Sequence, residues 1–304
     1  MPDPQHPPVP PVSRRSQPRF RSRERRAELA AAFTAQGPDY DRLRPGYPAQ
    51  AIDAILTAAG PATVAGSAGA AGPATTAIDL GAGTGKLTLA LAARGLNVAA
   101  VDPSAAMLEV IESATAPVPG TAPAPGATSA PTTAPAPAPV SVRTLRRSAE
   151  DTGLPSDAAD IVTAAQAWHW FDLEPATAEA HRLLRPGGVL ALLWNTLDVQ
   201  IPWVHRYARI MHAGDVQRDD FSPPMTGDFT LLERRVVRWE DPRTTAELID
   251  LARTRSYVIT ASETIRDKVL ANLDWYVHEH LGHERGAVVG LPYRTDLFLY
   301  RPTG

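Results

Sequence analysis

Short apolar runs alternate along the chain with stretches whose apolar residues repeat at helical spacing. Parallel strands buried on both faces are apolar throughout, whereas helices that cover them repeat apolar residues every three or four positions. We expect strands at 76–80, 97–102, 140–145, 160–164 and 189–194, and helices at 84–94, 105–112 and from 172 to about 185. This alternation predicts an α/β fold in which helices cover a mostly parallel sheet.

The pattern changes in the last third of the chain. Helical spacing at 204–211, 245–251 and 265–280 is separated by strand-like stretches at 229–239 and 293–301. We interpret the helices as a cover, about 197–288, inserted after the fifth strand. Open α/β sheets bind ligands at the carboxyl edge of their strands, so the cover is expected to lie there.

The apolar run at 76–80 leads directly into Gly81-Ala82-Gly83-Thr84-Gly85-Lys86. Closely spaced glycines allow a tight turn and a close approach of backbone to a ligand at the start of a helix. A phosphate-binding P-loop is excluded because positions 80 and 87 are both leucine, and the dinucleotide fingerprint fits only in part. Asp79 before the turn disfavours an anionic phosphate ligand.

Composition narrows the class of protein. The chain has 304 residues, a net charge of -3 and no cysteine, which excludes disulfides, thiolate catalysis and cysteine-based zinc sites. It has no apolar run of the ~20 residues that a membrane span needs, and no apolar leader segment. We expect a cytoplasmic, bacterial protein that binds neither nucleic acid nor membrane.

Two segments have the composition of unpacked chain. Residues 1–30 hold seven arginines against three acids and are predicted to be a disordered tail, which leaves 31–304 as the folded domain. The Ala/Pro/Thr-rich stretch 114–139 is predicted to be a low-complexity insert, and 60–75 a flexible loop.

Taken together, the motifs of this chain resemble those of class I S-adenosylmethionine-dependent methyltransferases, in the branch that acts on small molecules. Asp79–Gly85 resembles their first motif, Gln166–Asp172 the motif after the fourth strand, and Arg185–Gly188 the turn before the fifth. Tyr40–Pro48 resembles the N-terminal element that closes over the cofactor. The resemblance implies a Rossmann-like, doubly wound sheet of seven strands, mostly parallel with the last strand antiparallel, and S-adenosyl-L-methionine as cofactor.

The resemblance also implies the site residues. Asp102 would accept both ribose hydroxyls, which suits the two oxygens of a carboxylate, and Asp79 would face the cationic methionine portion. The cofactor-binding candidates are Tyr40, Arg44, Asp79, Gly81, Ala82, Gly83, Gly85, Asp102, Pro103, Met107, Ala149, Glu150, Gln166 and Ala167. Trp168, His169 and Tyr257 are candidates for the acceptor site, although Trp168 and Tyr257 could equally pack in the core.

Methyl transfer from a sulfonium needs mainly positioning and exclusion of water. An oxygen or nitrogen acceptor can require a base, and His169 is the candidate by its position. A non-catalytic S-adenosylmethionine-binding protein is the alternative, while Asp79 and Lys86 disfavour an NAD-dependent oxidoreductase. His278 and His280 would not share a helix face, so no metal site is expected. The acceptor, its reacting atom and the oligomeric state stay open.

Overall fold

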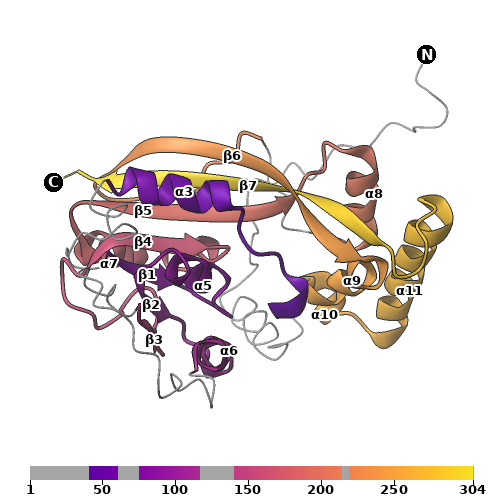
Figure 1. The fold of residues 1–304 in the computed structure, drawn as a ribbon, viewed down its shortest axis with the longest axis horizontal. Coiled ribbons are helices and arrows are strands. Elements are labelled where there is room, and N and C mark those ends of the chain that lie inside the picture. Colours follow the sequence, from indigo (N-terminus) through magenta and orange to yellow (C-terminus); the bar gives the residue numbers. More distant parts are fainter. Residues whose placement is uncertain (1–40, 61–74, 117–139, 214–218, 304) are drawn as a thin grey trace, which may run out of the picture.

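The structure is a computed structural model that describes residues 41–60, 75–116, 140–213 and 219–303. The predicted tail at 1–30, Tyr40 and nearly all of the two predicted loops at 60–75 and 114–139 lie outside these ranges. The described residues form one seven-stranded sheet with strand order β3-β2-β1-β4-β5-β7-β6 (Figure 1).

The sheet matches the predicted topology. Its strands are β1 Thr76–Leu80, β2 Asn97–Val101, β3 Val142–Leu145, β4 Ala159–Ala165, β5 Leu184–Leu197, β6 Phe229–Thr244 and β7 Val288–Pro302. β1 to β5 pair in parallel, and the final strand β7 lies antiparallel between β5 and β6. The prediction of a mostly parallel sheet of seven strands with the last one antiparallel is therefore confirmed.

Helices cover both faces of the sheet, as Figure 1 shows. They are α3 Ala49–Ala58, α5 Lys86–Ala92, α6 Ala105–Thr115, α7 Leu173–Leu183, α8 Pro202–Ile210, α9 Thr245–Asp250, α10 Ser256–Ile259 and α11 Glu263–Trp275. Successive residues of a strand point to opposite faces. Accordingly Leu192 of β5 packs in the cluster that contains α7, while its neighbour Leu193 packs with α3 and α5.

The cover has a small hydrophobic core of its own. Val204 and Tyr207 of α8, Leu248 of α9 and Leu273 of α11 are all fully buried there, together with Leu43 from the N-terminal segment. Leu291 and Tyr293 of β7 also belong to this core, so the cover packs against the end of the sheet where β7 begins (Figure 1). None of the helices within the described ranges is long and apolar enough to cross a membrane.

The antiparallel pair of long strands, β6 and β7, differs from the prediction in its bounds. The strand expected at 229–239 extends to Thr244, and the one expected at 293–301 begins at Val288. Pairing continues to Thr244↔Val288, so backbone hydrogen bonds hold Glu240-Asp241-Pro242 in strand geometry although its composition is typical of a loop. The segment between β5 and β7 is thus a strand plus helices, and the predicted helix at 265–280 ends as a π-helical turn, Tyr276–His280.

Candidate functional site

The glycine turn after β1 has left-handed backbone at all three glycines, with φ of +66° at Gly81, +54° at Gly83 and +84° at Gly85. A Cβ at Gly81 would lie 2.6 Å from the Cβ of Ala167, and a Cβ at Gly85 would lie 2.6 Å from Cγ1 of Ile111. A Cβ at Gly83 would meet no atom of the described residues within 4 Å. Packing therefore requires glycine at two of the three positions, while the described part of the chain leaves space beside the third.

Gly85→Ala should destabilise the protein more than Gly95→Ala does. Both glycines have φ near +85°, where an L-residue is strained by about 1–2 kcal/mol, but a Cβ at Gly95 would meet nothing within 4 Å. At Gly85 the new methyl group must also displace Ile111 of α6, which adds about 1–3 kcal/mol of overpacking. Urea unfolding of both variants measures the difference, and equal losses would contradict the packing argument.

Asp102, directly after β2, contacts both the glycine turn and the start of α6. Its Oδ2 accepts a hydrogen bond from the backbone N–H of Gly83 at 2.9 Å, and its Oδ1 accepts one from that of Ser104 at 2.8 Å. Ser104 in turn caps α6 by accepting a hydrogen bond from the N–H of Met107. Burial raises the pKa of Asp102, and the two backbone amides oppose that rise. Since each carboxylate oxygen has two lone pairs, both keep one for a further donor.

The position of Asp79 corrects the expectation that its carboxylate faces a ligand directly. The side chain is 1 % exposed, and its two oxygens accept hydrogen bonds from the hydroxyls of Thr88 and Thr163, each at 2.7 Å. Desolvation by burial raises its pKa to about 6, against the two threonine hydrogen bonds. The carboxylate of Asp79 is therefore enclosed within the fold, where both of its oxygens accept hydrogen bonds from threonine side chains.

The loops after β3 and β4 meet the glycine turn at the same edge of the sheet. Oε1 of Glu150 accepts a hydrogen bond from the N–H of Asp172 at 2.9 Å. Gln166 has a φ of +57°, and its side-chain amide donates to the carbonyl of Asn195 at 2.6 Å. Since Ala167 packs against Gly81, the structure brings together the candidates from all three loops. Ala82 lies in the glycine turn and Ala149 in the loop after β3, while Pro103 and Met107 lie in the loop after β2 and in the first turn of α6.

Trp168 and His169 differ from their predicted roles. Trp168 is 2 % exposed in the core and donates its indole N–H to the carbonyl of Pro224, so it does not face an acceptor. Nδ1 of His169 accepts a hydrogen bond from the indole N–H of Trp194 at 3.4 Å. A neutral imidazole has a single lone pair in the ring plane. His169 can therefore act as a base only if this hydrogen bond breaks.

The N-terminal segment connects the glycine turn to the cover. Asp41 forms an ion pair with Lys86 at the start of α5, at 3.2 Å. Arg44 donates to the carbonyl of Thr254 in the cover at 2.8 Å, and the side-chain amide of Asn195 donates to the carbonyl of Gly46. Asn195 and Lys86 were not among the predicted site residues, because their partners are far away in the sequence.

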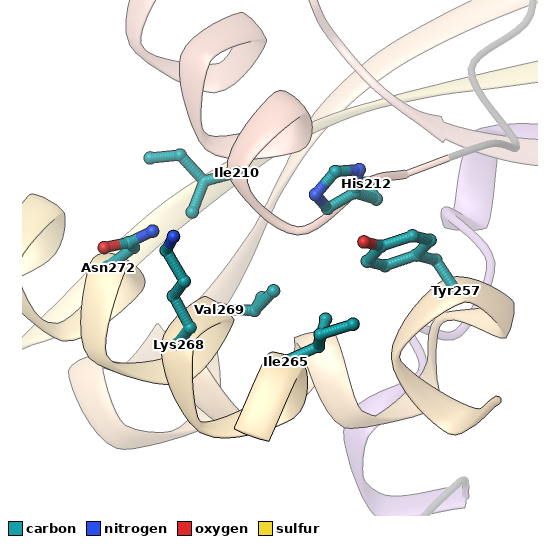
Figure 2. A pocket seen from close by; sticks show the side chains of 7 residues that line it. All are labelled: Ile210, His212, Tyr257, Ile265, Lys268, Val269 and Asn272. Atoms are coloured by element: carbon teal, nitrogen blue, oxygen red, sulfur yellow. The ribbon is translucent and has the colours of Figure 1, made fainter. Parts of the chain in front are cut away.

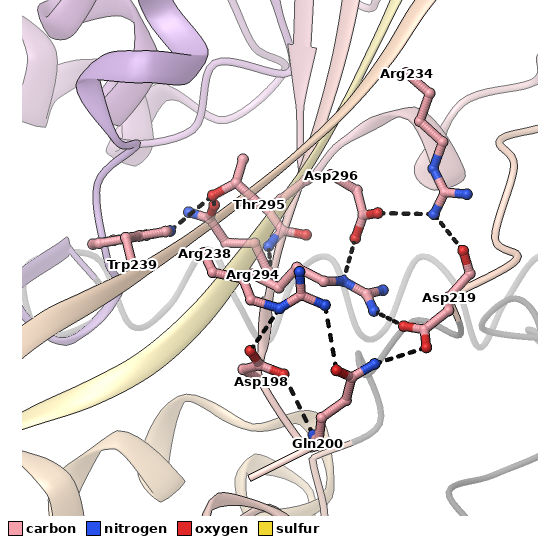
Figure 3. A network of polar contacts seen from close by, with 11 residues as sticks. Asp198, Gln200, Asp219, Arg234, Arg238, Trp239, Arg294, Thr295 and Asp296 are labelled. Carbon is pink, nitrogen blue, oxygen red and sulfur yellow. Dashed lines mark hydrogen bonds and ion pairs between the residues drawn. The ribbon is translucent and has the colours of Figure 1, made fainter.

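A second set of polar residues that the sequence did not indicate lies on β6 and β7 (Figure 3). Asp296 is fully buried and accepts hydrogen bonds from Nε of Arg294 at 2.8 Å and from Arg234 at 3.0 Å. Arg294 also pairs with Asp219. The signal available in the sequence was the polar run Arg294-Thr295-Asp296 between the apolar residues of this strand.

Metal-binding side chains do not gather in the part of the chain that the structure describes. His278 contacts the carbonyl oxygen of His283 through Nδ1 at 2.8 Å, and His280 stacks on Trp275 and Tyr276. These histidines are thus engaged in packing and backbone contacts.

Comparisons with known proteins agree with this arrangement. A family model described as a methyltransferase domain matches residues 78–192. An uncharacterized methyltransferase of Mycobacterium tuberculosis is 36 % identical over 271 residues, which cover 89 % of this chain and 95 % of the relative. An uncharacterized methyltransferase-like protein of Schizosaccharomyces pombe is 27 % identical, and the match covers 80 % and 84 % of the two chains.

Among solved structures, one described as a candidate type II methyltransferase from Anaeromyxobacter dehalogenans has the same fold. The TM-score is 0.56 and the sequence identity 24 %, and the match covers 84 % of this chain and 96 % of that one.

Proposed function

Because this chain belongs to the class I S-adenosylmethionine-dependent methyltransferases, we propose that it transfers a methyl group from S-adenosyl-L-methionine to a small-molecule acceptor. The observation that carries the proposal is the convergence of the glycine turn, Asp102 and Glu150 at one edge of the sheet. Ligands of open α/β sheets bind at this edge.

The residues fit an adenosine ligand without a pyrophosphate. The open space beside Gly83 leaves the backbone accessible. Asp102, 9 % exposed, is held by two backbone amides with lone pairs to spare, which suits two vicinal ribose hydroxyls. The carboxylate of Glu150, next to Ala149 in the chain, would accept a hydrogen bond from the adenine amino group. The buried charge of Asp79 would favour a cationic ligand over an anionic one.

The chain's own contribution to the reaction is then binding, orientation and exclusion of water. The bound cofactor supplies a methyl group that its sulfonium already activates. Arg44 ties the N-terminal segment to the cover, and Asp41 ties it to the helix after the glycine turn, which would enclose the cofactor. Orientation and exclusion of water can account for most of the rate of such a transfer.

Transfer is tested with a labelled methyl group. The purified protein is incubated with S-adenosyl-L-methionine labelled in its methyl group and with a metabolite extract, and mass spectrometry searches for labelled products. Calorimetric titrations with S-adenosylhomocysteine and with NAD run in parallel. Binding of NAD without binding of S-adenosylhomocysteine would overturn the proposal.

Asp102→Ala should weaken S-adenosylhomocysteine binding by roughly 30-fold. The variant loses two hydrogen bonds to the ribose, each worth about 1 kcal/mol. Asp102→Asn keeps one acceptor oxygen and should lose less. Calorimetry measures both affinities, and thermal unfolding reports any loosening of the turn at Gly83. Unchanged affinity in Asp102→Ala would remove this residue from the cofactor site.

A further inference from the structure

The cover holds a pocket of about 330 Å³ between α8, α10 and α11 (Figure 2). It is lined by Ile210, His212, Tyr257, Lys268, Val269 and Asn272. This volume is at the small end of the range for ligand sites, which are concave, largely apolar and carry a few polar groups. Val269 and the partly exposed Ile265 form the floor of the pocket, and its polar groups lie at two sides. Most of these side chains are exposed, so the pocket opens to solvent.

One side of the pocket carries a cation. Lys268 and Asn272 are four residues apart on α11, so their side chains project from the same face of the helix. Figure 2 shows Nζ of Lys268 directed toward Ile210, on the same side of the pocket as Asn272 and opposite His212 and Tyr257. Within the described residues no acid pairs with this ammonium group. An anionic group of a ligand could therefore pair with Lys268 and accept a hydrogen bond from the amide of Asn272.

The opposite side is a pair of stacked rings. His212 lies 3.9 Å from Tyr257 between ring centroids, with an interplanar angle of 23°. His212 follows the end of α8 with a φ of +53°, a position and conformation at which glycine is the usual residue. A histidine at this position strains the backbone, but it supplies an imidazole ring that glycine would not. Tyr257 is 41 % exposed, so the pair offers a flat surface to a ligand.

This aromatic wall is connected to the cofactor side of the molecule. α10, which carries Tyr257, begins two residues after Thr254, whose carbonyl binds Arg44. The same N-terminal segment reaches the helix after the glycine turn through Asp41 and Lys86. The pocket and the glycine turn are therefore joined by one short segment of chain.

We propose that this pocket binds the methyl acceptor, and that the acceptor is a small molecule with a flat, unsaturated body and an anionic group. The flat body would pack beside His212 and Tyr257 above Val269, and the anion would pair with Lys268. This inference rests on the proposed function, since it names the class of acceptor.

The ligand chemistry is tested with two probes of one shape, 2-naphthoate and the neutral 2-naphthamide, titrated into the full chain by calorimetry. We expect 2-naphthoate to bind at least tenfold more tightly. Lys268→Met should abolish this difference, whereas Arg235→Met, which removes an exposed cation on β6, should keep it. Equal affinities of the two probes for the native protein, or an unchanged preference in Lys268→Met, would overturn the proposal.

The variant His212→Gly tests the contribution of the aromatic rings to binding without disturbing the fold. Glycine suits the left-handed backbone at this position, so the melting temperature should stay the same or rise. Both probes should nevertheless bind several-fold more weakly, because the stacked surface is lost. Undiminished binding of both probes would remove the rings from the site.

The role in methyl transfer has its own readout. Passing the metabolite extract over an anion-exchange resin, or adding 2-naphthoate, should suppress the labelled products. If labelling persists under both treatments, the pocket is not the acceptor site, while the proposed function stands. If S-adenosylhomocysteine does not bind and no product is labelled, the proposed function fails, and the acceptor assignment fails with it.

Discussion

Asp79→Asn should make the protein more resistant to heat at pH 8, and the gain should disappear as the pH falls toward 4. The carboxylate is 1 % exposed, and burial raises its pKa from 3.8 to about 6. An asparagine keeps the shape and removes the buried charge. It can still accept a hydrogen bond from one of the two hydroxyls, of Thr88 and Thr163, and donate to the other.

The direction of this pH dependence follows from proton binding at Asp79. Between pH 4 and 6 the folded state of the native protein binds more protons at Asp79 than the unfolded state does, so stability falls as the pH rises through this window. Well above pH 6 the native protein has lost all of the stability that proton binding at Asp79 contributes. A rise from 3.8 to about 6 corresponds to about 3 kcal/mol, which is the upper limit of the expected gain.

Thermal unfolding of both proteins from pH 4 to pH 8 measures this effect, with Asp267→Asn, at an exposed position of α11, as the control. A gain that does not depend on pH would contradict the explanation. The stabilised variant should also bind S-adenosyl-L-methionine less well, and lose less affinity for S-adenosylhomocysteine, which has no sulfonium charge. Such an exchange of stability for function is common at ligand sites.

Asp296→Ala should lower the free energy of unfolding by about 3–5 kcal/mol, the usual cost of breaking a buried ion pair from one side. Asp296 is fully buried and Arg294 is 5 % exposed. The alanine variant leaves Nε of Arg294 without its acceptor, and Arg234 loses the same carboxylate (Figure 3). Urea unfolding measures the loss.

The double variant Arg294→Met with Asp296→Leu is the matched comparison. It removes both charges from the interior and fills the space with apolar side chains, a change that is often neutral in proteins. It should therefore be more stable than Asp296→Ala alone. Two results would contradict this account of the Arg294–Asp296 ion pair. One is a double variant that is less stable than Asp296→Ala, and the other is a loss of unfolding free energy below about 1 kcal/mol in Asp296→Ala.

Local signals in the chain were sufficient for the elements that form the floor of the site. The apolar run of β1, the three glycines and the serine cap of α6 lie within a few residues of the groups they affect. Their outcome depends on backbone preferences and periodicity, which are encoded locally. The same holds for Asp102, whose partners Gly83 and Ser104 are the neighbouring turn and the next helix start.

The roles of individual side chains could not be predicted in this way. Asp79 was expected to face the ligand, but Thr163, 84 residues further along the chain on the neighbouring strand β4, donates a hydrogen bond to it. His169 was expected to serve as a base, but Trp194 donates to its Nδ1. The extension of β6 through Glu240 depends on β7, which follows some fifty residues later.

The sequence by itself determined the class of fold, the mostly parallel sheet and the tight turn after the first strand, because glycine geometry and hydrophobic periodicity act over a few residues. Only the tertiary structure decided which carboxylates are buried, which ring nitrogen can accept a proton and where the cover leaves a pocket. Those properties arise from contacts between segments distant in sequence, and burial and hydrogen bonding are set by all the groups that meet at one point in space.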